Sequence, residues 1–218
     1  MSGPTDLELV DLTAALYAPP AGLFDHVIQI DPLAPYIGVK HCDGYDVAVP
    51  RGSITVADWD RDALSEIGRV VKGYEVLGLL PYGFSLHFAD SYAALAKVLR
   101  PGIPLAIGAH SLGCPQGLYL AAAHILAGGV FSRMALFEPP NPGTAHLVAF
   151  FAHADLSPWW NKGDEVPNLP VPIPPFLPWC PVRPARRFDI APSPDASHSL
   201  MPRHSIALCQ QAVRAASV

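Results

Sequence analysis

The stretch from residue 104 to residue 117, Pro-Leu-Ala-Ile-Gly-Ala-His-Ser-Leu-Gly-Cys-Pro-Gln-Gly, constrains the fold more than any other part of the chain. An apolar run that predicts a buried strand leads directly into Ser111, and a helix is expected to begin near Pro115. The small residues Ala109 and Gly113 flank Ser111 at two-residue spacing, as a sharp bend requires. Such an elbow between a strand and a helix exposes a hydroxyl above a parallel sheet, with the amide groups of the helix start facing it.

Composition predicts one globular domain over residues 1–218, since half of the residues are apolar and only 15% are charged. The 14 Lys and Arg against 19 Asp and Glu, without a long basic run, argue against nucleic acid as a partner. The four cysteines are scattered, so we expect free thiols and no metal site or disulfide framework.

We expect no transmembrane segment, because no stretch approaches the ~18 continuous apolar residues that a membrane helix needs. The N-terminus lacks the basic start and apolar core of a signal peptide. The sequence therefore predicts a cytoplasmic protein, with secretion left open if a leader has been removed.

Hydrophobic patterns predict strands and helices in alternation. Helices are expected at 5–17, 88–99, 116–127, 145–154 and 202–216, and strands at 36–41, 45–49, 105–109, 132–137 and 187–190. Asp43-Gly44 between the first two strands is typical of a hairpin. The fold class expected is α/β, a mostly parallel central sheet flanked by helices, with an antiparallel hairpin leading in. The proline-rich stretch 158–194 is expected to be an extended surface segment.

A serine nucleophile needs a histidine to accept its proton and a carboxylate to orient that histidine. In elbow-type enzymes the acid follows the serine and the histidine comes last. Asp164, in a turn-rich loop, is the first candidate for the acid. Asp189 ranks second because it lies in a strand pattern, and Glu165 is an alternative if the loop turns differently.

Two late histidines are candidates for the base. If Pro202 opens the last helix, His204 lies inside its first turn and its direction is tied to the helix axis. His198 then lies in the loop before the helix, from which it can reach Ser111, and it is preferred. His110 is expected to leave the turn in another direction and to have a supporting role.

Two backbone amides are expected to stabilise the oxyanion. One is that of Leu112, which follows the nucleophile, and the other comes from the turn Arg51-Gly52-Ser53 after an earlier strand. Ser53 can offer both its amide and its hydroxyl.

Several segments, in order, resemble the fungal-type (class 3) lipases. Ala109 to Gly113 is similar to the Gly-His-Ser-Leu-Gly of that family, and Asn161 to Pro170 to its acid loop Asn-x-x-Asp-x-Val-Pro-x-Leu-Pro. The other matching segments are Val47–Ser53 with Asp58, Trp59 and Asp62, Tyr82–Phe84, Phe137–Gly143, and His198–Leu200. Ala109, Cys114 and Glu138 stand where the family usually has glycines, and Pro50 where it has phenylalanine.

The resemblance implies an α/β-hydrolase fold and a carboxylic ester hydrolase that needs no metal or cofactor. It implies Ser111 as nucleophile, Asp164 as acid, His198 as base, and Ser53 with Leu112 as the oxyanion hole. The alternatives are a phospholipase A or acyltransferase on the same triad, and a noncatalytic binding protein that keeps the fold.

Aromatic side chains around the acid loop are candidates for contact with the substrate. Trp159 and Trp160 are expected to form an apolar wall for an acyl chain or to dock on a lipid surface, although they could equally pack on the core. Phe84 is expected on the opposite wall. Because no long amphipathic lid is recognisable after Ser53, we expect short to medium acyl esters as substrates rather than emulsified long-chain fat.

Overall fold

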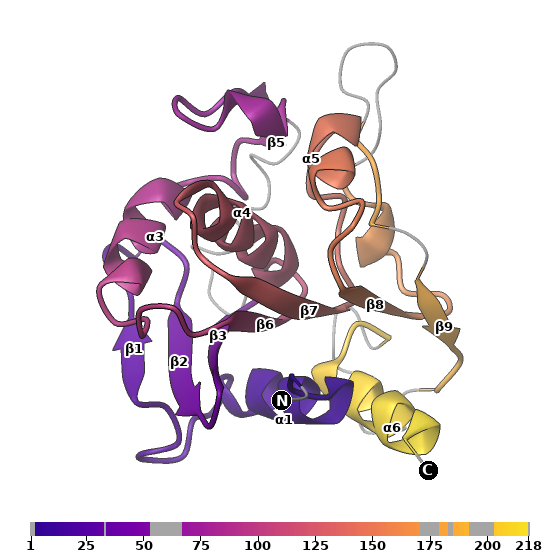
Figure 1. The fold of residues 1–218 in the computed structure, drawn as a ribbon. Helices are drawn as coiled ribbons and strands as arrows, with labels where there is room; N and C mark the ends of the chain where they lie inside the picture. Colours follow the sequence, from indigo (N-terminus) through magenta and orange to yellow (C-terminus); the bar gives the residue numbers. More distant parts are fainter. Residues whose placement is uncertain are drawn as a thin grey trace.

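A computed structural model of the chain describes residues 3–32, 34–52, 67–170, 179–182, 185–191 and 203–217. Its described strands form a seven-stranded sheet in the order β1-β2-β3-β6-β7-β8-β9 (Figure 1). These strands are β1 (His26–Ile28), β2 (Ile37–Cys42), β3 (Tyr45–Pro50), β6 (Leu105–His110), β7 (Phe131–Phe137), β8 (Leu156–Asn161) and β9 (Arg186–Phe188). The pairs β1/β2 and β2/β3 are antiparallel, and every later pair is parallel. The expected fold class, a mostly parallel sheet with an antiparallel hairpin leading in, is confirmed.

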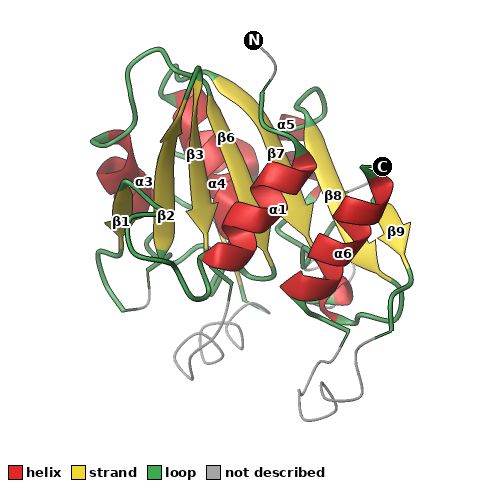
Figure 2. Cartoon of the chain, turned by 90° about the horizontal axis from the view of Figure 1, so that it is seen from below, coloured by secondary structure: helices red, strands yellow, loops and turns green. Residues whose placement is uncertain are grey.

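Helices cover both faces of the sheet. The helices are α1 (Asp6–Ala15), α3 (Phe88–Ala96), α4 (Gly113–Leu126), α5 (Ala145–Phe150) and α6 (Ile206–Ala216), with short 3-10 turns η2 (Glu75–Leu77) and η3 (Val166–Asn168). Figure 2 shows α1 and α6 lying side by side across one face, whereas α3, α4 and α5 lie on the other. A separate two-stranded ribbon joins β4 (Gly68–Arg69) to β5 (Leu80–Pro81). No helix among the described residues is long and apolar enough to cross a membrane.

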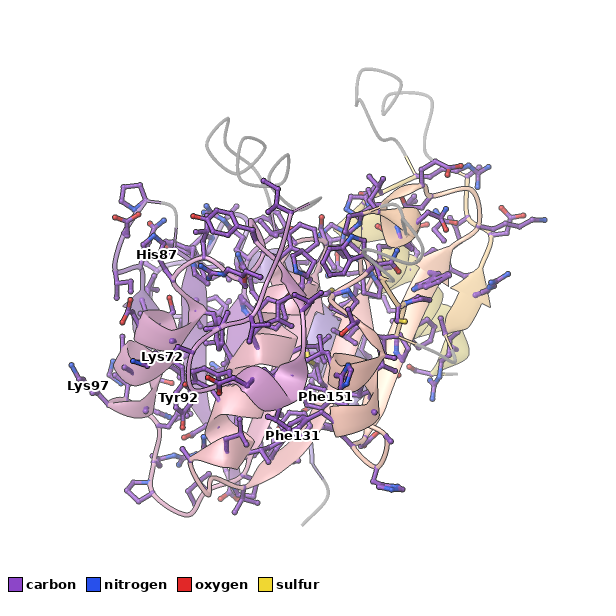
Figure 3. All side chains as sticks on the ribbon, turned by 90° about the horizontal axis from the view of Figure 1, so that it is seen from above. Lys72, His87, Tyr92, Lys97, Phe131 and Phe151 are labelled. Atoms are coloured by element: carbon purple, nitrogen blue, oxygen red, sulfur yellow. The ribbon has the colours of Figure 1, made fainter. Side chains whose placement is uncertain are left out.

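The core is divided by the sheet into two apolar clusters. The cluster on the α4 side contains buried leucines and aromatic residues of α3, α4 and β6. At its edge Phe131 and Phe151 lie close together in Figure 3, with ring centroids 6.3 Å apart. The cluster on the other side joins α1 and α6 to β3, β7 and β8. Gly108 of β6 lets α1 approach closely, because a Cβ there would lie 2.7 Å from the Thr13 hydroxyl. Side chains of β6 belong to both clusters, so apolar packing on the two faces of the sheet fixes the strand that leads to Ser111.

Local signals predict several elements well. Helix α1 begins after Thr5, whose side chain accepts the Glu8 amide while the Glu8 carboxylate accepts the Thr5 amide. The hairpin between β2 and β3 turns at Gly44, whose φ of 81° suits glycine. The strand expected before the elbow is β6, and the expected strand after its helix is β7.

Strand β8 was expected as part of an extended surface segment, and this prediction is wrong. It contains Pro158, which normally argues against a strand inside a sheet. The carbonyls of Asp155 and Trp159 accept the amides of Met134 in β7 and of Glu138 just after it, so the nitrogen of the intervening Pro158 faces β9. The β9 ladder covers only residues 159–161, and the missing N–H therefore breaks no bond of the sheet.

Two helix starts also differ from expectation. Helix α4 begins at Gly113, directly after the turn, instead of near Pro115. Helix α6 begins at Ile206 with Ser205 as its N-cap, instead of at Pro202, which lies outside the described residues. His204 thus precedes the helix, and the reason for ranking it below His198 does not hold.

Candidate active site

The turn after β6 has the geometry of a nucleophile elbow. Ser111 has φ 56°, a left-handed conformation unusual for a residue with a side chain, and its amide donates to the Phe137 carbonyl at 3.0 Å. Gly113 is required because a Cβ there would collide with the carbonyl oxygen of Pro50. Ser111 is partly exposed while the rest of the turn is buried, so its hydroxyl is the accessible group.

Cys114, where the resembling family has glycine, fits the elbow by bonding to it. Its thiol contacts the Ala109 carbonyl oxygen at 3.2 Å and that of Phe137 at 3.5 Å. Burial raises the pKa of this thiol well above its usual value, so it stays protonated and donates. The departure from glycine therefore adds hydrogen bonds without opening the packing.

The turn after β3 lies directly against the nucleophile. A Cβ on Gly52 would lie 3.1 Å from the Ser111 Cβ and would also clash with Tyr17 Oη. Leu112 is the N-cap of α4, and among the described residues no backbone carbonyl accepts its amide. An unpaired amide at a helix start is suited to an oxyanion. Ser53, the other expected donor, lies outside the described residues.

Asp164 lies in the loop that follows β8 and is 8% exposed. Its Oδ1 accepts the Val166 amide at 3.0 Å, which fixes the carboxylate, and its Oδ2 lies 2.7 Å from His204 Nδ1. The alternative acid Asp189 is exposed and pairs with Arg203 and Lys162, and these bonds lower its pKa. Glu165 is exposed as well. Of the three acids, only Asp164 contacts a histidine in the part of the chain that the structure describes.

His204 lies in the segment just before α6, and hydrogen bonds to the end of β8 hold this segment in place. The Asn161 side-chain amide donates to the carbonyls of Ile190 and Arg203, at 3.1 and 3.2 Å. The Arg203 guanidinium in turn donates to the Lys162 carbonyl at 2.8 Å. His204 Nδ1 faces Asp164, whereas its Nε2 is buried and has no partner in the described part of the chain. His198, the preferred base of the sequence analysis, lies outside the described residues.

His110 connects this histidine to the elbow. Its ring stacks on that of His204 with centroids 4.8 Å apart, and it directly precedes Ser111 in the chain. His110 Nδ1 lies 2.7 Å from the Tyr17 hydroxyl, and its Nε2 lies 3.2 Å from Glu138 Oε2. Burial lowers the pKa of His110 well below its usual value, so the ring is neutral.

Glu138 follows β7 and is completely buried, with φ 55°. Its Oε2 lies 3.2 Å from His204 Nδ1 as well as 3.2 Å from His110 Nε2. Burial, and after it the charge of Asp164, raises the pKa of Glu138 to about 10. Glu138 is therefore a neutral carboxylic acid at pH 7, placed between two histidines.

Comparison with solved structures identifies the architecture. A triacylglycerol lipase from Penicillium expansum matches with a TM-score of 0.63 at 16% identity, over 84% of this chain and 79% of that one. Lip2 lipase from Yarrowia lipolytica matches with a TM-score of 0.64 at 17% identity, over 86% and 78%. The chain has the α/β-hydrolase fold of the fungal lipases.

Sequence comparison adds nothing to this likeness. No protein-family model matches the sequence, and no relative is found among curated proteins.

A third solved structure, the triacylglyceride lipase of Rhizomucor miehei, matches with a TM-score of 0.59 at 18% identity, over 76% of this chain and 74% of that one. In this α/β-hydrolase fold the elbow, the acid loop and the segment before α6 meet at the carboxyl edge of the sheet (Figure 1).

His110, Glu138 and His204 are close enough together to surround a metal ion, since one ligand atom from each lies within 4.8 Å of the others. Nδ1 of His204 already faces Asp164 at 2.7 Å, and Nε2 of His110 faces Glu138 at 3.2 Å. A cation would have to displace the protons of these contacts as well as that of the neutral Glu138. We therefore interpret the cluster as a hydrogen-bond network.

The three expected substrate contacts are buried side chains, with Trp159 and Phe84 4% exposed and Trp160 8% exposed. The Trp159 ring donates to Asp6 of α1 at 3.0 Å and packs in the cluster between α1 and α6. Phe84 packs in the cluster on the α4 side. These contacts correspond to the core alternative, and contact of the three with a substrate stays a prediction.

A cavity of about 530 Å³ lies among apolar side chains of α4, α5 and the start of β8, with Val182 and Cys180 on its rim. Neither Ser111 nor His204 lines it. The cavity is therefore not assigned to the site.

Sequence reasoning missed the roles of Tyr17 and Glu138. A signal for Glu138 was present, because it ends the strand expected next to the elbow strand. The carboxyl ends of neighbouring parallel strands meet at one edge of the sheet, so its side chain had to lie near that of His110. Tyr17 follows α1 and carried no comparable signal.

Proposed function

We propose that the protein is a serine carboxylic ester hydrolase, with Ser111 as nucleophile, His204 as base and Asp164 as orienting acid. The observation that carries the proposal is the 2.7 Å contact between Asp164 Oδ2 and His204 Nδ1, with the His204 ring stacked on His110, the residue that precedes the elbow serine. The likeness to fungal lipases supports the same class of reaction. The base differs from the one that the sequence analysis preferred, because α6 begins only at Ile206.

The orientation of His204 suits its role. With Nδ1–H donating to Asp164, the lone pair of Nε2 is available for the serine proton. That nitrogen is buried and has no hydrogen-bond partner among the described residues, the Ser111 hydroxyl included, so the serine and the histidine come within hydrogen-bond distance only when substrate is bound. Asp164 then stabilises the imidazolium that forms.

The reaction proceeds in two steps. Ser111 Oγ attacks the ester carbonyl while His204 takes its proton, and the Leu112 amide donates to the negative oxygen. Ser53 is proposed as the second donor to this oxygen. The alcohol leaves with the proton from His204, and a water activated by the same nitrogen releases the acid from the acyl-enzyme. This scheme needs no metal and no cofactor.

Labelling with an organophosphonate ester tests the nucleophile. We expect one phosphonyl group per protein molecule and its absence in Ser111→Ala, with mass spectrometry as the readout. An intact fold without labelling at mildly alkaline pH would favour the noncatalytic binding protein instead.

Single alanine substitutions test the base. We expect His204→Ala to abolish ester hydrolysis, and His198→Ala to retain it. The reverse result would restore His198 as the base and leave His204 as a supporting residue.

The proposed substrates are short to medium acyl esters, and a lipid surface is a proposed site of contact. Rates on a series of p-nitrophenyl esters and on an emulsified triglyceride test this chain-length preference. Higher turnover on long-chain triglyceride than on a butyrate ester would contradict it.

A further inference from the structure

Two carboxyl groups face the same nitrogen of the proposed base. Asp164 Oδ2 lies 2.7 Å from His204 Nδ1, and Glu138 Oε2 lies 3.2 Å from it. Their side chains are almost completely buried, with Glu138 at 0% and Asp164 at 2% exposure. Two like charges so close together in a buried site repel strongly, so one carboxyl keeps its proton.

Glu138 is the protonated one, because Asp164 accepts the Val166 amide and makes the shorter contact with His204, 2.7 Å against 3.2 Å. The hydrogen bonds around His110 show how Glu138 is held. The Tyr17 oxygen accepts the Gly52 amide, and burial raises the pKa of this phenol far above its usual range. Its proton is therefore donated to His110 Nδ1 at 2.7 Å, which leaves the ring N–H on Nε2. That N–H donates to Glu138 Oε2 at 3.2 Å, so the proton of Glu138 resides on its other oxygen.

We propose that Asp164 and Glu138 form a carboxyl pair that shares one negative charge at Nδ1 of His204, with Glu138 as its protonated, positioning member. The proposal rests on the proposed ester hydrolysis. Glu138 Oε2 accepts a hydrogen bond from His110 and also faces His204, so it fixes the position of the two stacked rings relative to each other. It is also placed to carry the charge when Asp164 cannot.

The neighbourhood of Glu138 leaves few groups that change charge in the assay range. The titratable side chains that face it come from the turn after α1, from β6, α4, the loop after β8 and the segment through α6. They are Tyr17, His110, Cys114, Asp164, His204 and Cys209. Burial keeps Tyr17, Cys114 and Cys209 protonated and His110 neutral. Ionisation at this site therefore concerns the carboxyl pair and His204.

The Asp164→Asn variant tests whether Glu138 can replace Asp164 as the charged carboxylate at His204. Removing the Asp164 charge removes one of the two causes that raise the pKa of Glu138, so Glu138 ionises more easily. Loss of the orienting acid alone lowers kcat by roughly 10⁴-fold in serine hydrolases. For Asp164→Asn we expect a loss of only about 10²-fold at pH 9, because Glu138 then serves as the carboxylate. Its kcat/KM rises with pH by up to about tenfold per unit, since the ionised form alone is active.

The double variant D164N/E138Q tests whether Glu138 supplies this activity. We expect it to lose the remaining activity, to about 10⁴-fold below wild type, and to lose the rise with pH. The matched control is D164N/E165Q, which removes an exposed carboxylate of the same loop and is expected to retain the profile of Asp164→Asn. Thermal unfolding verifies each fold, and D164N/E138M is the second variant if the glutamine does not fold.

Equal rates of Asp164→Asn and D164N/E138Q at every pH would overturn the proposal. The same holds if D164N/E165Q loses the pH-dependent activity of Asp164→Asn. Failure of the proposed function is recognised separately, because the wild type would then show no ester hydrolysis and no phosphonate labelling, or both would persist in Ser111→Ala.

Discussion

The proton on Glu138 predicts a specific dependence of stability on pH. The pKa of Glu138 is about 10 in the folded protein, against an ordinary value of 4.5. Between these values the folded state keeps a proton that the unfolded state has lost, so rising pH favours unfolding. In Glu138→Gln the side chain keeps nearly the same shape but has no proton to lose. The pH dependence of stability that Glu138 causes is therefore absent in this variant.

The magnitude follows from the linkage of one proton. Each pH unit between the two pKa values changes the free energy of unfolding by about 1.4 kcal/mol. Over pH 6.5 to 8.5 the wild type is therefore expected to lose about 3 kcal/mol more than Glu138→Gln. Glu138 is fully buried, so solvent does not screen this effect.

Equilibrium urea unfolding of both proteins at pH 6.5, 7.5 and 8.5 measures this difference. Titrating groups that do not contact Glu138 contribute equally to both proteins and cancel in the comparison. A difference in unfolding free energy that stays constant within about 0.5 kcal/mol across this range would refute a protonated Glu138.

Three further predictions concern the frame of the site. Asn161→Ala removes the donors to two carbonyls that hold the segment before α6, and we expect a loss of about 1–3 kcal/mol in urea unfolding. Its kcat should fall roughly tenfold with little change in KM, because the base is displaced; an unchanged kcat would show that this anchor does not position His204. Gly52→Ala places a Cβ against Tyr17 Oη and the His110 carbonyl, so phosphonate labelling of Ser111 should slow and stability should fall by about 1–3 kcal/mol. Dialysis against a chelator should leave ester hydrolysis and the unfolding temperature unchanged; a loss of either that added zinc restores would support a metal at His110, Glu138 and His204 instead.

The parts of the fold that follow local rules were predictable from the sequence. The elbow depends on small residues beside Ser111, the first helix on a capping box, and the hairpin on Gly44, and each rule involves residues close in the chain. Strand β8 was missed because whether Pro158 is tolerated depends on the length of its neighbour β9. That length is not visible in the residues around the proline.

For the candidate site, the acid was predictable from the sequence and the choice of base was not. Asp164 was selected from its loop, and the structure brings it to a histidine. The choice between His198 and His204 depended on the first residue of α6, and a shift of that boundary from Pro202 to Ile206 reverses the argument. Sequence patterns locate helices better than they locate helix ends. Here both Pro202 and Ser205 suit a helix start, so the pattern did not decide between them.

Glu138 shows how a departure from a family pattern can indicate chemistry. From the sequence alone, the glutamate was only a departure from the glycine of the resembling family, because its surroundings in the fold were unknown. In the fold it lies at the carboxyl edge beside the elbow strand, where a buried charge is tolerated only with a partner. Glu138 contacts two histidines, and burial, followed by the charge of Asp164, raises its pKa, so the protonated form is the stable one. The same burial that makes ionisation costly thus makes Glu138 a hydrogen-bonding acid, and the proposed catalytic group includes a second carboxyl.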